Sequence, residues 1–186
     1  MSNDFLPKGY KEDAGGYMKL EEGENKFRIL SSAKVGWEYW NEDKEGNRRP
    51  IRKHLDEDLI MSEIQEPDKV KKFWAFIVWN YKLEAIQILE LTQKGLKRDI
   101  TALINNSKWG SPVDSYDLTI NREGKDKTTK YSVVPDPKEP TDKEVKDALK
   151  KKYVDLEALF RGEDPFLAIK GQKMNENVNP NDVHLD

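Results

Sequence analysis

The run Phe73–Tyr81 constrains the fold of this chain more than any other segment. It alternates like a β-strand, and neither face is polar: one face carries Phe73, Ala75, Ile77, Trp79 and Tyr81, and the other carries Trp74, Phe76 and Val78. A strand with one face in a core normally shows polar residues on the other. This strand is therefore either buried on both sides or exposes aromatic rings to a ligand. Both outcomes require a sheet, so we expect a mainly β fold.

Further strand-like segments and one helical segment surround this run. A long strand begins at Lys26 and bends or bulges near Gly36, and a return strand covers Glu84–Leu91. A hairpin then joins Val113–Arg122 to Thr128–Val134. Before that hairpin, residues 92–106 place apolar side chains at helical spacing under a basic outer face. This element order predicts the five-stranded OB-fold, a Greek-key barrel with an α-helix between strands 3 and 4.

The sequence predicts one folded domain with appendages. Residues 1–17 are expected to form a flexible N-terminal arm, and residues 18–137 the OB-fold domain. A capping box at Thr141–Glu144 indicates a C-terminal helix within 138–161, and residues 162–186 are expected to be an acidic flexible tail. The apolar stripe that this helix is expected to pack against the barrel consists of Val145, Leu149, Leu156 and Phe160.

The composition excludes several classes of protein. The 186 residues include no cysteine, so there is no disulfide, thiolate metal site or cysteine nucleophile. The chain has neither a secretory signal pattern nor an apolar run of about 18 residues, and we expect a soluble, cytoplasmic protein. With two histidines, no GxSxG motif and no phosphate-binding glycine loop, we expect neither an enzyme nor a cofactor.

One short stretch resembles a metal site. His54, Asp56, Glu57 and Asp58 offer ligands to a hard divalent ion. They stand beside a cluster of arginines, where acidic residues more often act as solvated counter-charges, and no second constellation completes a catalytic site. We therefore expect no metal. A divalent-metal nuclease that uses Asp56 and Asp58 stays open as an alternative, to be tested with labelled single strands and Mg²⁺ or Mn²⁺.

The charge is unevenly distributed along the chain. The net charge is −3, yet residues 25–135 contain 20 lysines and arginines against 17 acidic residues, a net of +3. A basic middle with acidic flanks suits a protein that holds a polyanion in its centre. The cations expected to contact phosphates fall in the two connections that flank an OB binding face and on the helix: Arg48, Arg49, Arg52, Lys53, Lys94, Arg98, Arg122, Lys125, Lys127 and Lys130.

Aromatic residues are concentrated on the strands of the expected binding sheet. Single-stranded nucleic acid exposes the flat faces of its bases, which stack on aromatic side chains. The expected stacking residues are Trp37, Tyr39, Trp40, Trp74, Phe76, Trp79 and Tyr81. Core packing is the alternative for each ring. However, Trp37 and Trp40 have opposite parity, as do Trp74 and Trp79, so a regular strand turns one of each pair outward.

Several segments together resemble phage-encoded single-stranded-DNA-binding replication proteins. The resemblance covers roughly 18–137 and is carried by Asn25–Ser32, Val35–Trp40, Phe73–Tyr81, Ile86–Lys94, Trp109–Pro112, Tyr116–Leu118 and Tyr131–Pro135. It implies an OB-fold that coats single strands during replication, recombination and repair, with an acidic C-terminus that recruits partner proteins in the bacterial host cytoplasm. Some related phage proteins hold a structural zinc with cysteine and histidine, and this chain lacks the cysteines.

The expected function is sequence-independent binding of single-stranded DNA. Bases stack on outward rings, most plausibly Trp37, Trp40, Trp74 and Tyr81, while the cations neutralise phosphates. The acidic tail is expected to compete with DNA for this groove, so that its deletion tightens binding. Two alternatives stay open: an RNA-binding OB module, which matched oligo-dT and oligo-U titrations would separate, and a protein-interaction adaptor with an apolar contact patch.

Overall fold

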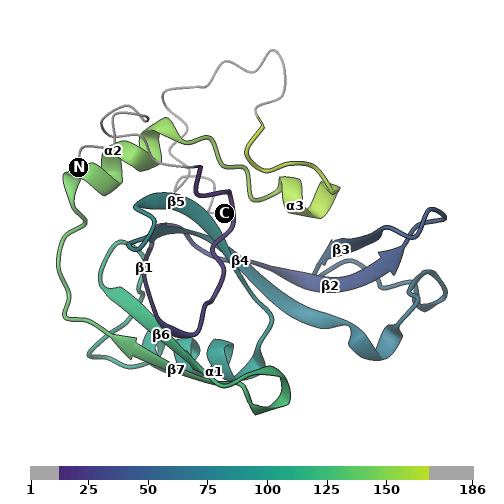
Figure 1. The fold of residues 1–186 in the computed structure, drawn as a ribbon, viewed down its shortest axis with the longest axis horizontal. Helices are drawn as coiled ribbons and strands as arrows, with labels where there is room; N and C mark the ends of the chain where they lie inside the picture. The colour runs from purple at the N-terminus through teal and green to yellow at the C-terminus, as the bar shows by residue number, and fades with distance from the viewer. Residues whose placement is uncertain (1–12, 168–186) are drawn as a thin grey trace, which may run out of the picture.

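The computed structural model describes residues 13–167 (Figure 1). Seven strands in this range form one antiparallel sheet: β1 (Gly23–Ile29), β2 (Lys34–Glu42), β3 (Arg48–His54), β4 (Lys71–Asn80), β5 (Ala85–Leu91), β6 (Asp117–Glu123) and β7 (Lys130–Pro135). The helices are α1 (Lys94–Ile104), α2 (Lys143–Lys151) and α3 (Ala158–Arg161), with 3₁₀ turns η1 (Met61–Glu63), η2 (Pro67–Lys69) and η3 (Asp126–Thr128). The mainly β class is confirmed.

The long strand β4 organises the sheet. It pairs with β5 along one edge, and along the other edge with β2 at its beginning and β1 at its end. The single long strand expected from Lys26 is therefore two strands laid end to end, and the break falls at 30–33 rather than at Gly36. At the break, the hydroxyl of Ser31 accepts the hydrogen bond of the Ile77 amide at 2.8 Å, in place of a backbone carbonyl. The ladder of β4 thus stays satisfied across the interruption.

The sheet is open, so the closed five-stranded barrel predicted from the sequence is not confirmed. Strand β1 pairs with β6, and β6 pairs with β7, but β7 does not return to β5 within the described chain. The edge of β5 is instead covered by residues 14–18, where Met18 and Gly16 exchange backbone hydrogen bonds with Ile88. Helix α1 lies between β5 and β6 in the chain, as predicted, and packs against β7.

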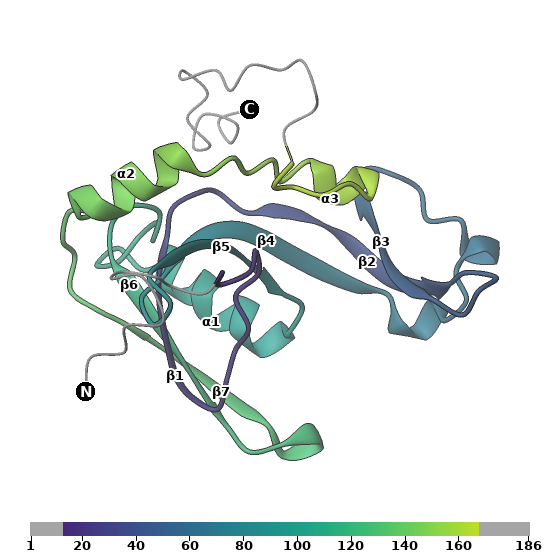
Figure 2. The ribbon, with the colours of Figure 1, turned by 45° about the horizontal axis from the view of Figure 1, so that its top comes forward.

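The sheet has two strands more than predicted, one because the long first strand is divided into β1 and β2, and one because the expected first connection contains β3. Strand β3 pairs with β2, and together with residues 71–75 of β4 they form a three-stranded extension that we call the arm. Figures 1 and 2 show the arm projecting from the rest of the sheet. At its far end the Gln65 side chain accepts from the Glu42 amide and donates to the Glu42 carbonyl, which closes the edge that β4 leaves open.

Two hydrophobic clusters lie on opposite faces of β4, which is why both of its faces are apolar. Phe76 and Val78 belong to the cluster shared with β1, β6 and α1, and Ala75 and Ile77 belong to the cluster under the C-terminal segment. Figure 2 shows α1 on one side of β4 and α2 and α3 on the other. Of the two explanations offered by the sequence, burial on both sides applies to most of this strand.

The C-terminal segment covers the second cluster in two pieces. The segment expected as one helix over 138–161 contains α2 and the short α3, joined by a non-helical stretch. Val145, Leu149 and Leu156 are buried, as their spacing predicts, and Phe160 is partly buried. Gly36 owes its presence to this packing, since a Cβ there would lie 2.4 Å from the carbonyl oxygen of Lys53 and 2.7 Å from the Phe160 ring.

A buried ion pair attaches this segment to the sheet. Arg28 donates from Nε to Asp117 at 2.6 Å, and from Nη1 to the Glu139 carbonyl at 2.9 Å and the Thr141 hydroxyl at 2.8 Å. Tyr81 also donates to Asp117, at 2.9 Å. The guanidinium of Arg28 and the carboxylate of Asp117 thereby gain hydrogen-bond partners in the interior, as buried charges require. The chain that leads into α2 is held in place by these bonds.

The predicted appendages lie largely outside the described residues. Of the flexible N-terminal segment expected over 1–17, residues 14–17 are hydrogen-bonded to β5. Of the acidic tail expected over 162–186, the described part ends at residue 167. No helix within 13–167 is both long enough and apolar enough to cross a membrane.

Candidate nucleic-acid interface

One rung of the arm places an indole between two ammonium groups. Trp37 on β2 lies opposite Lys53 on β3 and opposite Lys72 on β4, and partners in an antiparallel ladder point to the same face. The Lys72 Nζ sits 5.1 Å from the centroid of the Trp37 ring, within reach of a cation–π interaction. The pairing of three strands therefore creates an aromatic and cationic row on one face of the arm.

A second indole lies diagonally beside this row. Trp74 is opposite Val35, two residues along each strand from the Trp37–Lys72 pair, so the two indoles share a face. Diagonal neighbours in such a ladder are separated by about 7–8 Å. Trp74 packs in part against the hydrophobic cluster that β4 shares with β1, β6 and α1. Both Trp74 and Trp37 are partly exposed.

Helix α1 adds lysines beside the same rung. The ammonium of Lys97 donates to the backbone carbonyl of Lys72 at 2.6 Å, which brings the helix next to the start of β4. Burial, together with the positive charges of Lys72 and Lys94, holds the pKa of Lys97 below its usual range. Between residues 13 and 167, no carboxylate lies within 4.0 Å of these three ammonium groups. The cluster is therefore positively charged without a local counter-charge.

We call this surface the arm face, and it consists of Trp37, Lys53, Lys72, Trp74, Lys94 and Lys97. Flat rings beside uncompensated cations can bind a ligand that has both an aromatic surface and negative charge. Lys53 differs from the other lysines of the arm face because it has a nearby carboxylate, that of Glu57, 3.9 Å from its ammonium. The sequence pattern does not identify Lys72 and Lys97 as phosphate contacts, although Lys97 lies one helical turn from Lys94 and next to Arg98.

The structure separates the seven aromatic residues predicted to stack. Tyr39, Phe76 and Trp79 are buried, with at most 5% of each exposed, and are unavailable to a base because neighbouring residues enclose them. Trp40 is 44% exposed but lies on the face of β2 opposite Trp37, across from Pro50. Of the seven, Trp37 and Trp74 are the two that lie on the same face of the sheet and are both partly exposed.

Tyr81 is fixed within the polar network at the far end of β4. Its hydroxyl donates to Asp117, and the ammonium of Lys26 lies 5.0 Å from its ring. Burial and the hydrogen bond to Asp117 raise the pKa of Tyr81 to about 12. Tyr81 is nine residues along the strand from Lys72, about 30 Å at the usual rise, so it does not belong to the arm face.

Two of the predicted phosphate ligands already have partners within the protein. Arg52 is nearly buried between Glu38 and Glu90, with both contacts at 2.9 Å, and these carboxylates satisfy its guanidinium. Arg122 donates to the Leu20 carbonyl at 2.8 Å, which joins β6 to the segment before β1. Parity and clustering do not reveal such partners, because they come from distant parts of the chain.

The other predicted cations are at the surface. Arg48, Arg49 and Arg98 lie near Glu66, Asp43 and Asp99 in exposed ion pairs, which contribute little and open readily. Lys94 stands on the arm face. The hairpin that joins β6 to β7 carries exposed lysines whose ammonium groups have no carboxylate within 4.0 Å among the described residues: Lys125, Lys127 and Lys130.

His54 is part of a clasp between β3 and α3. Its Nδ1 lies 2.8 Å from Glu57 and its Nε2 2.9 Å from Glu157, while its ring stacks on Phe160 at 3.8 Å. Burial opposes the charged form, but the hydrogen bonds to Glu157 and Glu57 outweigh it and raise the pKa of His54. In the described range, no three histidine or acidic side chains converge on a metal-sized site.

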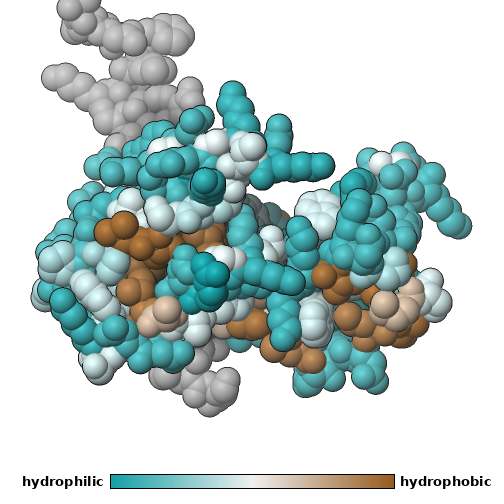
Figure 3. All heavy atoms as spheres, turned by 90° about the horizontal axis from the view of Figure 1, so that it is seen from below, coloured by the Kyte–Doolittle hydropathy of each residue, from teal (hydrophilic) through white to brown (hydrophobic). Residues whose placement is uncertain are grey.

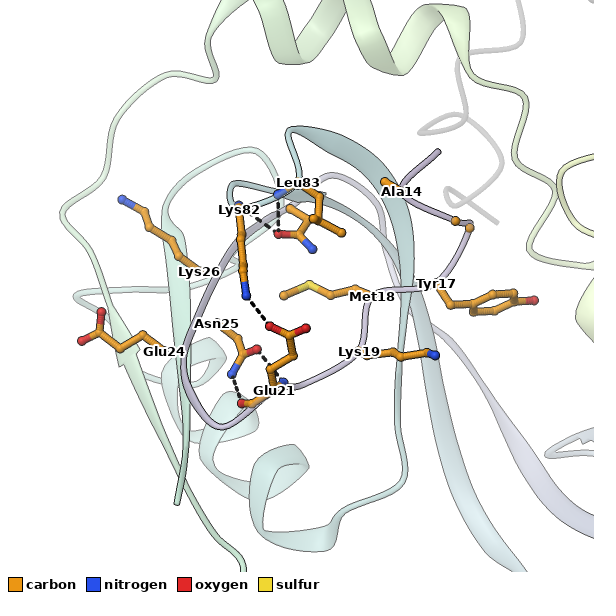
Figure 4. A pocket seen from close by; sticks show the side chains of 13 residues that line it. Ala14, Tyr17, Met18, Lys19, Glu21, Glu24, Asn25, Lys26, Lys82 and Leu83 are labelled. Carbon is orange, nitrogen blue, oxygen red and sulfur yellow. Dashed lines mark hydrogen bonds and ion pairs between the residues drawn. The ribbon is translucent and has the colours of Figure 1, made fainter. Parts of the chain in front are cut away.

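A cavity of about 350 Å³ lies elsewhere, between residues 14–24 and the end of β4 (Figure 4). Some of its polar groups already bond within it: Lys82 pairs with Glu21, and the side-chain amide of Asn25 donates to the backbone carbonyl of Glu21 at 2.8 Å. None of the residues predicted to bind nucleic acid lines it. We therefore do not include this cavity in the candidate site.

Comparison with known proteins identifies no relative: no family model, curated protein or solved structure is significantly similar to the chain.

Proposed function

We propose that this chain binds single-stranded DNA without strong sequence preference, and that it coats exposed strands during replication, recombination or repair without catalysis. The observation that carries the proposal is the arm face, where Trp37 and Trp74 stand beside Lys72, Lys94 and Lys97. Bases stack on the indoles, and the lysines neutralise phosphates. Stacking uses the flat face that all bases share, so this arrangement does not depend on sequence.

We further propose that the body of the sheet is OB-like. The pairing order β5-β4-β1-β6-β7, with α1 between β5 and β6, follows the strand sequence expected for that fold. In this assignment the arm is an elaborated connection between the first two strands, and the β6–β7 hairpin is the connection between the last two. These two connections flank the binding face of OB-folds. Both carry exposed cations here, which supports the assignment.

The decisive test compares two tryptophans on opposite faces of the same strand. Trp37→Leu removes a stacking platform from the arm face and is expected to weaken oligo-dT binding about 5- to 150-fold, the equivalent of about 1–3 kcal/mol. Trp40→Leu is the matched control, because Trp40 is exposed on the other face, and it is expected to leave the affinity nearly unchanged. Equal effects of the two substitutions would overturn the proposed site.

A protein-interaction adaptor is the second candidate, favoured by one observation. The connection from β3 to β4 exposes Leu55, Ile60 and Met61, each by about half, and apolar residues are visible on the arm in Figure 3. Exposed apolar groups of this kind mark protein contacts when they are contiguous. Salt distinguishes the candidates, because phosphate binding loses affinity with a log–log slope of about 0.7 per contact on single strands.

A further inference from the structure

The ammonium of Lys72 occupies a position that a stacked base needs. Its Nζ lies 5.1 Å from the centroid of the Trp37 ring, and Lys53 is the neighbour of the ring on its other side. No carboxylate within 13–167 lies within 4.0 Å of the Lys72 ammonium. In the ligand-free protein this ring face is therefore covered by a cation.

We infer that Lys72 is an exchangeable occupant of Trp37, a role that rests on the proposed binding of single strands to the arm face. Lys72 covers the indole in the free protein and moves to a phosphate when a base takes its place. The side chain is free to make this move, because its residue is exposed and it holds no ion pair in the described structure. Its flexible stem allows the charge to swing while the backbone stays in the ladder.

The exchange makes the site respond to a combination of chemical groups. A phosphate alone pulls Lys72 off the ring and leaves the indole bare, so the cation–π contact is lost without replacement. A nucleotide supplies a phosphate for the ammonium and a base for the ring, so both contacts are replaced. Lys72 should therefore act as a phosphate contact for strands with bases, and not for strands without them.

The neighbouring lysines differ from Lys72 in this respect. Lys97 donates to the backbone carbonyl of Lys72 at 2.6 Å, and within residues 13–167 the ammonium of Lys94 lies over no aromatic ring. Both can meet a phosphate whether or not a base is present. Selectivity for nucleotides over other polyanions is thus assigned to the Lys72–Trp37 pair, within a site whose remaining charges attract any polyanion.

The test compares oligo-dT with an abasic strand of the same length, each titrated at several salt concentrations. For the native chain and Lys72→Ala, the log–log salt slopes should differ by about 0.7 with oligo-dT, so that a tenfold rise in salt costs the native chain about fivefold more affinity. With the abasic strand the slopes should coincide. In a Trp37→Leu background Lys72 has no ring to cover, so Lys72→Ala should lower both slopes equally.

Lys127→Ala is the matched control, since Lys127 is exposed on the β6–β7 hairpin and its ammonium lies over no ring in the part of the chain that the structure describes. Any slope change that it causes should be the same for both strands. Lys72→Ala lowering both slopes equally in the native background, or lowering neither, would overturn the inference while leaving DNA binding intact. Failure of the native chain to bind either strand would overturn the proposed function itself. The native-background comparison stands even where Trp37→Leu does not fold, which circular dichroism would reveal.

Discussion

Replacing Asp117 by asparagine should destabilise the fold strongly. Asp117 is 2% exposed at its side chain and is the carboxylate partner of Arg28, which is 1% exposed. An arginine stays protonated when its partner is removed. Asp117→Asn therefore leaves a buried positive charge with only the Glu139 carbonyl, the Thr141 hydroxyl and an amide as acceptors. Breaking a buried pair in this way costs about 3–5 kcal/mol.

Removing the arginine of the pair instead should cost less folding stability. After Arg28→Met, Asp117 still accepts from Tyr81 at 2.9 Å and lies 3.6 Å from the ammonium of Lys26, so its charge keeps a partner. Urea unfolding measures both variants. With a slope of about 2 kcal/mol per M, Asp117→Asn should lower the midpoint by about 1.5–2.5 M.

The exposed pair Lys143–Asp147 provides the control, and Asp147→Asn should leave the midpoint in place because solvent screens that pair. The reasoning fails if Asp117→Asn shifts the midpoint no more than Asp147→Asn does, or if Arg28→Met proves the more damaging of the two buried changes.

Two further predictions concern packing and pH. Gly36→Ala should destabilise the arm, because the added Cβ would lie 2.4 Å from the carbonyl oxygen of Lys53. Gly95→Ala should stabilise the protein by up to about 1 kcal/mol, because the space around Gly95 in α1 is open and alanine favours the helix. Thermal melts that rank the two variants the other way would refute this. His54 should titrate above 6.5 by NMR, and Glu157→Gln should lower its pKa. Because the folded pKa is the raised one, the clasp contributes its full stability below pH 6.5 and loses it as the pH rises through the folded pKa. A pKa of His54 at its ordinary value would contradict the hydrogen bonds assigned to this clasp.

The sequence predicts local structure well where periodicity is strong. The two apolar faces of Phe73–Tyr81, the helix near 94–104 and the β6–β7 hairpin all follow from alternation or helical spacing. The sequence predicts the interruption near Gly36 and not at 30–33, because the hydrogen bond that permits the break is donated to the Ser31 hydroxyl by the amide of Ile77 on β4, 46 residues away. Barrel closure was also overestimated, since pairing between β5 and β7 depends on long-range geometry that no local pattern encodes.

Parity alone identifies part of the candidate site. It places one tryptophan of each pair outward, yet it does not determine which face of β4 the C-terminal segment covers, and Trp79 is buried for that reason. Clustering of cations selects Arg52 as readily as Lys53, although Glu38 and Glu90 enclose only Arg52. Lys72 gains its significance from its register with Trp37, which the sequence does not reveal.

The central claim is that partly exposed indoles beside uncompensated lysines receive the bases of a single strand. It is tested most directly by titrating the native chain with oligo-dT while following tryptophan fluorescence at increasing salt. The account predicts quenching that saturates with DNA and an affinity that falls with salt by a log–log slope of about 0.7 for each lysine engaged. Binding without quenching, or an affinity that does not depend on salt, would contradict it.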